Sequence, residues 1–239
     1  MLIPEIKVVA DASSVALLAA ERIVAAAEAA IEIRDSFSIV LAGGTTPNLL
    51  YPLLATEEIR SLIDWTKTHV FFGDERCVPP DHADSNYRMA RESLLAKVPV
   101  PGDNIYRIRG EADPAEAAQD YDDTLKDYFA DTGPDVALLG MGDDGHTASL
   151  FPHTDALAET KRLCVANFVP RKNAWRVALT APFLNRSEQV LILATGAAKA
   201  VRVAEVLEGP RVPDELPIQL IQPLSGRLTW IMDAAAAGM

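Results

Sequence analysis

One short run, residues 135–139, restricts the fold more than any other feature of the sequence. It is almost entirely apolar and has the length of a strand, as expected for a strand that is covered on both faces in a parallel sheet. Gly140, Gly142 and Gly145 follow it and allow a ligand to approach the main chain closely. We therefore expect a buried strand that ends in a tight turn opening a helix. His146 then lies at the carboxyl end of the strand, where open α/β sheets bind ligands.

Similar apolar runs alternate with helical segments along the rest of the chain. The expected strands cover residues 6–10, 37–42, 69–73, 105–108, 163–169, 175–180, 189–194 and 228–233. The expected helices cover residues 12–34, 86–97, 114–130 and 197–208, with another beginning at residue 48. Because no linker interrupts this alternation, we predict an α/β protein with a single domain over residues 1–239. We expect a three-layer α/β/α, Rossmann-like open sheet that is mostly parallel, with a small antiparallel addition from the close pair of strands at 163–180.

Several helix starts carry recognisable capping residues. Asp11 precedes the helix at 12–34, and Thr46 with Pro47 is expected to start the helix that follows the second strand. Ser85 or Asp84 is the expected cap of the helix at 86–97. We interpret the acidic residues of the helix at 114–130 as a solvated face that binds no metal: Glu116, Asp120, Asp122, Asp123 and Asp127.

The overall charge limits the ligands that the protein can bind. With 22 Lys and Arg against 34 Asp and Glu, the net charge of −12 argues against broad nucleic-acid binding, so an anionic ligand requires a local cluster of cations. Cys77 and Cys164 form no CxxC pair, and His69, His82 and His153 have no ligand spacing, so neither a disulfide framework nor a metal site is expected. The sequence shows no amino-terminal signal and no apolar run of ~18 residues, so we expect a cytoplasmic protein that does not bind membranes.

A glycine pair followed by two hydroxyl residues is a second candidate for ligand binding. Gly43, Gly44, Thr45 and Thr46 link an expected strand to the amino end of a helix, where free backbone N–H groups and the helix dipole attract an anion. An ordinary strand-to-helix turn is the alternative interpretation. Lys199 lies in the first turn of a later helix, where a cation opposes the helix dipole unless an anion offsets it.

Polar or charged side chains follow the ends of several expected strands. They occur at residues 43–47, 74–76 and 144–146, at Arg171 with Arg176, and at 195–199. The carboxyl ends of parallel strands meet at one edge of a sheet, so we expect these side chains to share one cleft. Backbone donors, hydroxyls, carboxylates, a histidine and several cations together favour a phosphorylated polyol or sugar as the ligand.

On these motifs the chain resembles the 6-phosphogluconolactonase family, which belongs to a larger group that includes glucosamine-6-phosphate deaminase. The matching motifs lie at residues 41–47, 71–76 with 85–87, 140–152, 176–180 and 195–200. The most specific one reads Gly-Met-Gly-x-Asp-Gly-His-Thr-Ala-Ser-Leu-Phe-Pro, and Asp143 holds its variable position. Residues 169–174 depart from the Ser-Pro-Lys and prolines of the family, and Arg171 takes the position of the lysine.

The resemblance implies an enzyme that hydrolyses 6-phospho-D-glucono-1,5-lactone to 6-phospho-D-gluconate in the oxidative pentose phosphate pathway, without a metal or organic cofactor. The phosphate is expected on the turn of Gly43, Gly44, Thr45 and Thr46, with Arg176 and Lys199 closing around it. A δ-lactone is an activated ester, so its hydrolysis needs a positioned water, a base and stabilisation of the oxyanion, but no covalent nucleophile.

The resemblance and the residue types assign further roles at the reacting end. His146 is the expected general base, because a neutral imidazole can take a proton from water at cellular pH. Asp144 either orients this imidazole or binds a substrate hydroxyl. Arg76, together with Arg171, is expected to balance the charge that develops on the carbonyl oxygen. Asp74 either hydrogen-bonds the sugar hydroxyls or has a purely structural role.

Two other functions are compatible with the motifs. An amino-sugar-phosphate isomerase or deaminase shares the glycine turn, but residues 147–152 differ from the Ile-Ala-Phe-Asn-Glu continuation of deaminases and Arg76 replaces their aromatic residue. A non-catalytic sugar-phosphate sensor normally carries a DNA-binding module, for which we expect no room before the strand at 6–10. We therefore expect a phosphorylated sugar lactone as the small-molecule partner, no nucleic acid, and a monomer or weak homodimer.

Overall fold

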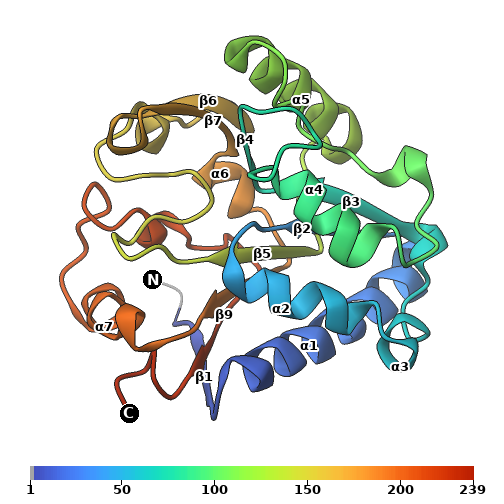
Figure 1. Ribbon diagram of the computed structural model, residues 1–239, viewed down its shortest axis with the longest axis horizontal. Helices are drawn as coiled ribbons and strands as arrows, with labels where there is room; N and C mark the ends of the chain where they lie inside the picture. Colours follow the sequence, from blue (N-terminus) through green and yellow to red (C-terminus); the bar gives the residue numbers. More distant parts are fainter. Residues whose placement is uncertain (1–2) are drawn as a thin grey trace.

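A six-stranded parallel sheet forms the centre of the protein (Figure 1). The computed structural model describes residues 3–239. The strands lie in the order β1, β9, β8, β5, β2, β3, and every neighbouring pair is parallel. Their bounds are Glu5–Val9 (β1), Phe37–Leu41 (β2), Thr68–Phe72 (β3), Val136–Gly140 (β5), Gln189–Ala194 (β8) and Arg227–Asp233 (β9). The run predicted as a covered strand is β5, and its residues 136–139 are buried, which confirms the prediction.

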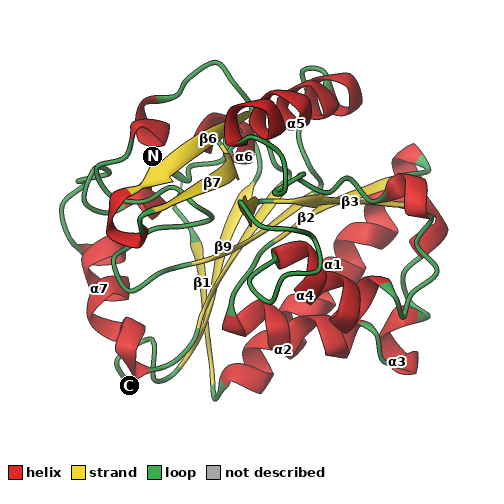
Figure 2. Ribbon diagram, turned by 45° about the horizontal axis from the view of Figure 1, so that its top comes forward, coloured by secondary structure: helices red, strands yellow, loops and turns green. Residues whose placement is uncertain are grey.

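Helices cover both faces of this sheet (Figure 2). One face carries α1 (Ala12–Arg34), α2 (Thr45–Leu54) and α4 (Asn86–Ala90), with the short α3 (Glu57–Arg60) beside α2. The other carries α5 (Pro114–Phe129), α6 (Ala181–Leu184) and a second sheet, and α7 (Ala200–Glu208) follows β8. The predicted mostly parallel, three-layer arrangement is confirmed. Within residues 3–239, no helix has the length and apolar character needed to cross a bilayer.

The second sheet contains three antiparallel strands in the order β4, β7, β6. The hairpin of β6 (Cys164–Val169) and β7 (Ala174–Leu179) is the antiparallel addition predicted from the sequence. The strand β4 (Asp74–Arg76) was not predicted as a strand from its charged residues. It follows β3 after a single glycine and pairs with β7, so one short segment of chain connects the two sheets.

Glu75 explains why the charged segment after β3 can pair as a strand. Its carboxylate is buried and accepts hydrogen bonds from the backbone N–H groups of Arg76, Asn86 and Tyr87 at 2.7–2.8 Å, and from the hydroxyl of Ser85 at 3.0 Å. Burial raises the pKa of this carboxyl group, and the hydrogen bonds oppose the rise. The expectation of charges at the mouth of the sheet is therefore wrong for Glu75, whose carboxylate holds the start of α4 against β4.

Most helix boundaries follow from local capping. Asp11 accepts a 2.8 Å hydrogen bond from the backbone N–H of Ser14, and α1 has the predicted bounds. Ser85 is the cap of α4, which ends at Ala90 and continues as a π-helical turn, Arg91–Leu95, where one regular helix was predicted. Single 3₁₀ turns occur at Trp65–Lys67, Gly102–Asn104, Asp155–Ala158, Pro170–Lys172, Ala197–Lys199 and Pro217–Leu220.

Two local predictions are wrong because tertiary contacts override the sequence pattern. The expected strand at 105–108 forms only a single bridge between Ile105 and Val70, in a segment without regular structure. Asp122, expected on a solvated helix face, is buried. Its carboxylate accepts hydrogen bonds from the backbone N–H groups of Leu163, at 2.6 Å, and Cys164, at 3.1 Å, so this acid joins α5 to β6.

Candidate active site

A cavity of about 310 Å³ opens at the carboxyl ends of β2, β5 and β8. It brings together most of the predicted site residues, namely Gly43, Gly44, Thr45, Thr46, Asp74, Arg76, His146 and Lys199. Asp144, Arg171 and Arg176 do not line it. The strand ends therefore meet at one edge, as the parallel topology predicts. Asp74 and Arg76 line the cavity as expected, but they belong to β4 of the second sheet, which was not predicted.

The turn after β2 has the features of an anion-binding helix start. Gly44 has φ of +105°, a left-handed value that favours glycine, and α2 begins directly after it at Thr45. No side chain caps α2, so the backbone N–H groups of its first turn face the cavity edge without a capping group. Thr46 is not the helix cap that the sequence suggests. Its hydroxyl lies 2.9 Å from the hydroxyl of Thr195, which follows β8.

Buried polar side chains beneath this turn hold it in place. The hydroxyl of Tyr51, whose ring is fully buried, donates to the carbonyl of Ala42 at 2.7 Å and accepts from its N–H at 3.0 Å. A Cβ at Gly43 would lie 2.1 Å from Oδ1 of Asn86, a buried side chain whose Nδ2 donates to Asp74. The role of Tyr51 was not predicted from the sequence. The sequence feature that could have indicated this role is a tyrosine in the helix that follows the glycine pair, because a buried tyrosine hydroxyl requires a hydrogen-bond partner.

His146 forms part of the cavity wall, and its ring is fixed on two sides. The imidazole stacks on the ring of Phe151, with centroids 4.0 Å apart and an interplanar angle of 21°. Its Nδ1 forms a hydrogen bond with Oδ1 of Asp144. In the neutral tautomer that donates the Nδ1 proton to this carboxylate, the lone pair lies on Nε2. The ring can therefore accept a proton from a molecule in the cavity.

Asp144 connects His146 to a cation outside the cavity. Oδ2 of Asp144 accepts a hydrogen bond from Nη1 of Arg171, while Oδ1 also accepts from the backbone N–H of His146 at 3.2 Å. Burial acts to raise the pKa of Asp144, but the hydrogen bonds and charge of His146 and the charge of Arg171 outweigh it and lower the pKa to about 2. Asp144 is thus ionised at neutral pH, and Arg171 contacts this carboxylate and not the cavity.

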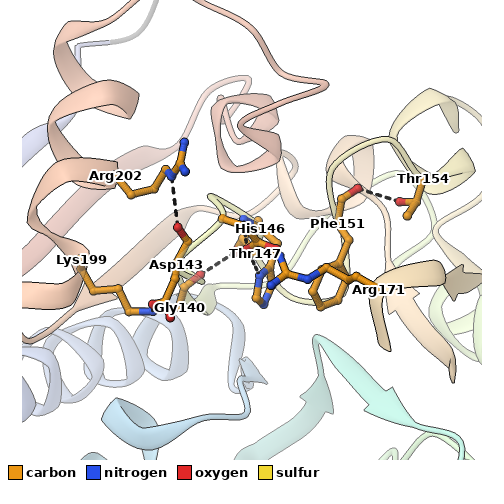
Figure 3. A network of polar contacts seen from close by, with 10 residues as sticks. Gly140, Asp143, His146, Thr147, Phe151, Thr154, Arg171, Lys199 and Arg202 are labelled. Carbon is orange, nitrogen blue, oxygen red and sulfur yellow. Dashed lines mark hydrogen bonds and ion pairs between the residues drawn. The ribbon is translucent and has the colours of Figure 1, made fainter. Parts of the chain in front are cut away.

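The segment that carries His146 is a loop, not the helix that the sequence suggests (Figure 3). The N–H of Gly142 donates to the carbonyl of His146 at 2.8 Å, and the hydroxyl of Thr147 donates to the carbonyl of Gly140 at 2.8 Å. Gly145 has φ of +79°, which interrupts any helix. A Cβ at Gly142 would lie 2.0 Å from Cε1 and Nδ1 of His146, so only glycine leaves room for the imidazole in this position.

The charged residues of β4 differ in their surroundings. Asp74 is buried, and its Oδ2 accepts a 2.6 Å hydrogen bond from the hydroxyl of Ser149. Nη1 of Arg76 donates to the carbonyl of Asp84 at 2.5 Å. Arg176 lies opposite Arg76 in the pairing of β4 with β7, and burial together with the neighbouring charge of Arg76 lowers the pKa of Arg176. Arg176 and Arg76 also line a hollow that adjoins the cavity.

Lys199, from the segment after β8, also lines the cavity. It precedes α7 directly, and its Nζ forms an ion pair with Oδ1 of Asp143 (Figure 3). Asp143 therefore supplies the anion that a cation at a helix start requires. Nε of Arg202 donates to the backbone carbonyl of Asp143 at 3.1 Å, so two residues of the segment after β8 contact the His146 loop.

Other reactive side chains near the cavity are engaged or protonated. The hydroxyl of Ser149 is buried and donates to Asp74. Cys77 is half-buried, and burial raises the pKa of its thiol. Cys77 and Cys164 are both free thiols. Within residues 3–239, no group of three or more His, Cys, Asp or Glu side chains is arranged to hold a metal ion.

The fold and the site define a member of a known α/β family. The family model described as glucosamine-6-phosphate isomerases/6-phosphogluconolactonase matches residues 10–230, and the chain belongs to this family. Within this family, the curated relatives with high coverage are 6-phosphogluconolactonases. The chain is 38% identical to a 6-phosphogluconolactonase of Nostoc sp., over 97% of this chain and 96% of the relative. It is 42% identical to the 6-phosphogluconolactonase of Synechocystis sp., over 87% and 86% of the two chains.

Solved structures agree with this placement. The 6-phosphogluconolactonase of Trypanosoma brucei superposes with a TM-score of 0.88 at 30% sequence identity, covering 100% of this chain and 99% of that chain. A monomeric glucosamine-6-phosphate deaminase has a TM-score of 0.83 at 19% identity, which shows a shared fold. The fold is thus shared by 6-phosphogluconolactonases and deaminases, and sequence identity separates the two groups: the relatives of higher identity are 6-phosphogluconolactonases.

Proposed function

We propose that this protein hydrolyses 6-phospho-D-glucono-1,5-lactone to 6-phospho-D-gluconate, the second step of the oxidative pentose phosphate pathway. One observation carries the proposal: an uncapped helix start, a lysine and a histidine bound to a carboxylate all line the same cavity. This arrangement suits a substrate with a phosphate at its tail and an ester at its head. The names and coverage of the relatives support the same reaction.

The phosphate binds at the turn after β2. The N–H groups of Gly44, Thr45 and Thr46 lie at the start of α2, where the helix dipole favours a dianion. Lys199 lines the same cavity, and its ammonium group adds a charge-assisted hydrogen bond. Arg176 is paired with Arg76 across β4 and β7 and does not line the cavity, so it acts on the phosphate only through its charge at longer range. The phosphate thus fixes the substrate by the group farthest from the lactone carbonyl.

His146 activates the attacking water. Nε2 accepts a proton from the water as its oxygen forms a bond to the lactone carbonyl carbon, and the imidazolium that results is stabilised by the carboxylate of Asp144. Arg171 keeps this carboxylate ionised and fixed in position. Asp144 is therefore a positioning residue for the base.

The guanidinium of Arg76 stabilises the oxyanion. It lines the cavity on the side of β4, and its contact with the carbonyl of Asp84 fixes its direction. The tetrahedral intermediate then collapses by breaking the bond between the carbonyl carbon and the ring oxygen, which takes up the proton from His146. Asp74 is held by Ser149 and Asn86 and offers its remaining lone pairs to sugar hydroxyls.

The proposed reaction is tested by producing the lactone in place with a glucose-6-phosphate dehydrogenase reaction and following its loss. We expect the wild type to accelerate hydrolysis over the rate in buffer, and His146→Ala to lose most of this acceleration while it still binds 6-phosphogluconate. A wild type no faster than buffer contradicts the proposed reaction. A fully active His146→Ala variant contradicts the proposed base.

We also infer a cytoplasmic protein that is a monomer or weak homodimer, with no nucleic-acid partner. Two free thiols suit a reducing compartment, and the net charge of −12 disfavours a nucleic-acid partner. Sedimentation velocity over a range of protein concentrations tests the oligomeric state. A stable tetramer or larger assembly contradicts it.

A further inference from the structure

Asp143 is bound to the same ammonium group that the phosphate requires. Its Oδ1 forms the ion pair with Nζ of Lys199, yet Asp143 itself does not line the cavity and its side chain is 75% exposed. The side chain of Lys199 is 23% exposed and lines the cavity. The ion pair therefore joins a residue outside the cavity to one that lines it, and the turn after β2 lines the same cavity as Lys199.

We propose that the carboxylate of Asp143 competes with the phosphate of the ligand for the ammonium group of Lys199. Because Asp143 holds Lys199 while the site is empty, it sets the affinity for substrate and product. This inference rests on the proposed function and deepens it. A carboxylate carries one negative charge, whereas a phosphate ester carries nearly two at neutral pH and also reaches the backbone N–H groups of α2. The phosphate displaces the carboxylate on binding, and the carboxylate returns as the product leaves.

The electrostatics of the pair support this exchange. The hydrogen bond and the charge of Lys199 lower the pKa of Asp143, so Asp143 is ionised and competes throughout the neutral range. Exposed ion pairs are weak, at about 0–1 kcal/mol, so an incoming dianion can break this one. When the pair opens, Asp143 is already solvated and does not become a buried, unpaired charge.

The position of Asp143 in the chain limits how far the exchange extends. The carbonyl of Asp143 remains bound to Nε of Arg202, and the N–H of Gly142 remains bound to the carbonyl of His146. These backbone contacts hold the loop while the side chain of Asp143 rotates away. We therefore expect Asp143 to affect the binding of phosphorylated ligands and not the turnover number.

The test compares Asp143→Asn with the wild type in lactone hydrolysis. Asparagine keeps the size of the side chain and removes its charge. We expect KM for the phosphorylated lactone, and the inhibition constant of 6-phosphogluconate, to fall together by about 2- to 5-fold, as the loss of an exposed ion pair implies. We expect kcat to be unchanged, and hydrolysis of the unphosphorylated glucono-1,5-lactone to be unaffected.

Two controls separate a specific exchange from a general effect of charge. Glu208→Gln removes one negative charge at the end of α7, far along the helix from Lys199, and is expected to leave KM unchanged. In a Lys199→Met background, Asp143→Asn is expected to have no effect on KM. Equal effects of Asp143→Asn and Glu208→Gln, or an effect that persists without Lys199, overturn the inference.

The two proposals fail in different ways. If the wild type hydrolyses the lactone and Lys199→Met raises KM, but Asp143→Asn leaves KM unchanged, the competitor role is wrong and the proposed function stands. If Lys199→Met does not change KM, the phosphate position itself is wrong. If the wild type has no lactonase activity, the proposed reaction is wrong.

Discussion

Nδ1 of His146 faces Oδ1 of Asp144, and the other carboxylate oxygen of Asp144 faces Arg171. We expect Asp144→Asn to lower kcat by about 100-fold or more, because an amide neither fixes the same tautomer nor stabilises the imidazolium. KM is expected to change little, since Asp144 does not line the cavity and its carboxylate is bound to His146 and Arg171. Asp127→Asn, on an exposed position of α5, is the matched control. A variant with wild-type kcat contradicts the positioning role.

The low pKa of Asp144 also predicts a pH dependence of stability. The folded-state pKa of about 2 lies below the ordinary value of 3.8, so ionisation of Asp144 stabilises the folded protein relative to the unfolded chain. The resulting stabilisation is complete above pH 3.8 and is lost as the pH falls toward 2. Urea unfolding between neutral and acid pH measures this loss. We expect Asp144→Asn to reduce the acid-dependent part, and an unchanged dependence contradicts the pairing.

Gly142 is expected to be essential for catalysis without being essential for folding. In Gly142→Ala the new methyl group collides with the imidazole of His146, so the ring must leave its position against Phe151. We expect a loss of kcat of at least 10-fold, with a circular dichroism spectrum like that of the wild type. Gly102→Ala, where the Cβ meets no atom within 4 Å, controls for the substitution itself. Full activity of Gly142→Ala shows that the ring position is not required.

Tyr51→Phe tests the support of the phosphate turn. The substitution keeps the ring but removes the partner of both backbone groups of Ala42, which stay buried. We expect the free energy of unfolding to fall by about 1–3 kcal/mol, the cost of leaving buried polar groups unpaired, and KM to rise. Tyr128→Phe, whose hydroxyl makes only a 3.4 Å contact with Ser36, is expected to change the stability less. Equal effects of the two variants contradict this role for Tyr51.

The parallel sheet was predictable because a strand that is buried on both faces has a continuous apolar sequence. The run at 136–139 has no polar alternation, and the capping at Asp11 is local, so strand and helix positions could be inferred there. The gathering of Gly43, His146 and Lys199 followed from the topology of parallel strands. Their detailed roles in binding and catalysis remain predictions.

The remainder of the site depends on contacts between distant segments. The sequence predicts that Glu75 is exposed. Its burial is stable only because four groups donate hydrogen bonds to its carboxylate. The His146 segment reads as a helix start, but Gly145 and the bond from Thr147 to Gly140 turn it into a loop. The partner of Arg171 is likewise set by how the β6–β7 hairpin packs over the loop. The burial of Glu75 and the partner of Arg171 depend on residues farther away in the chain, whereas the loop at His146 follows from Gly145 and a hydrogen bond between residues seven positions apart.

The hydrogen bond between the hydroxyls of Thr46 and Thr195 joins positions 149 residues apart in the sequence. Those threonines follow β2 and β8, which are not neighbours but are both paired with β5. The proposed phosphate site at the turn after β2 therefore forms only when three strands from different parts of the chain have assembled. We therefore expect phosphorylated ligands to bind only the completely folded chain. Binding of such a ligand during refolding would then report when assembly is finished, and we expect it to raise the thermal stability of the protein by mass action.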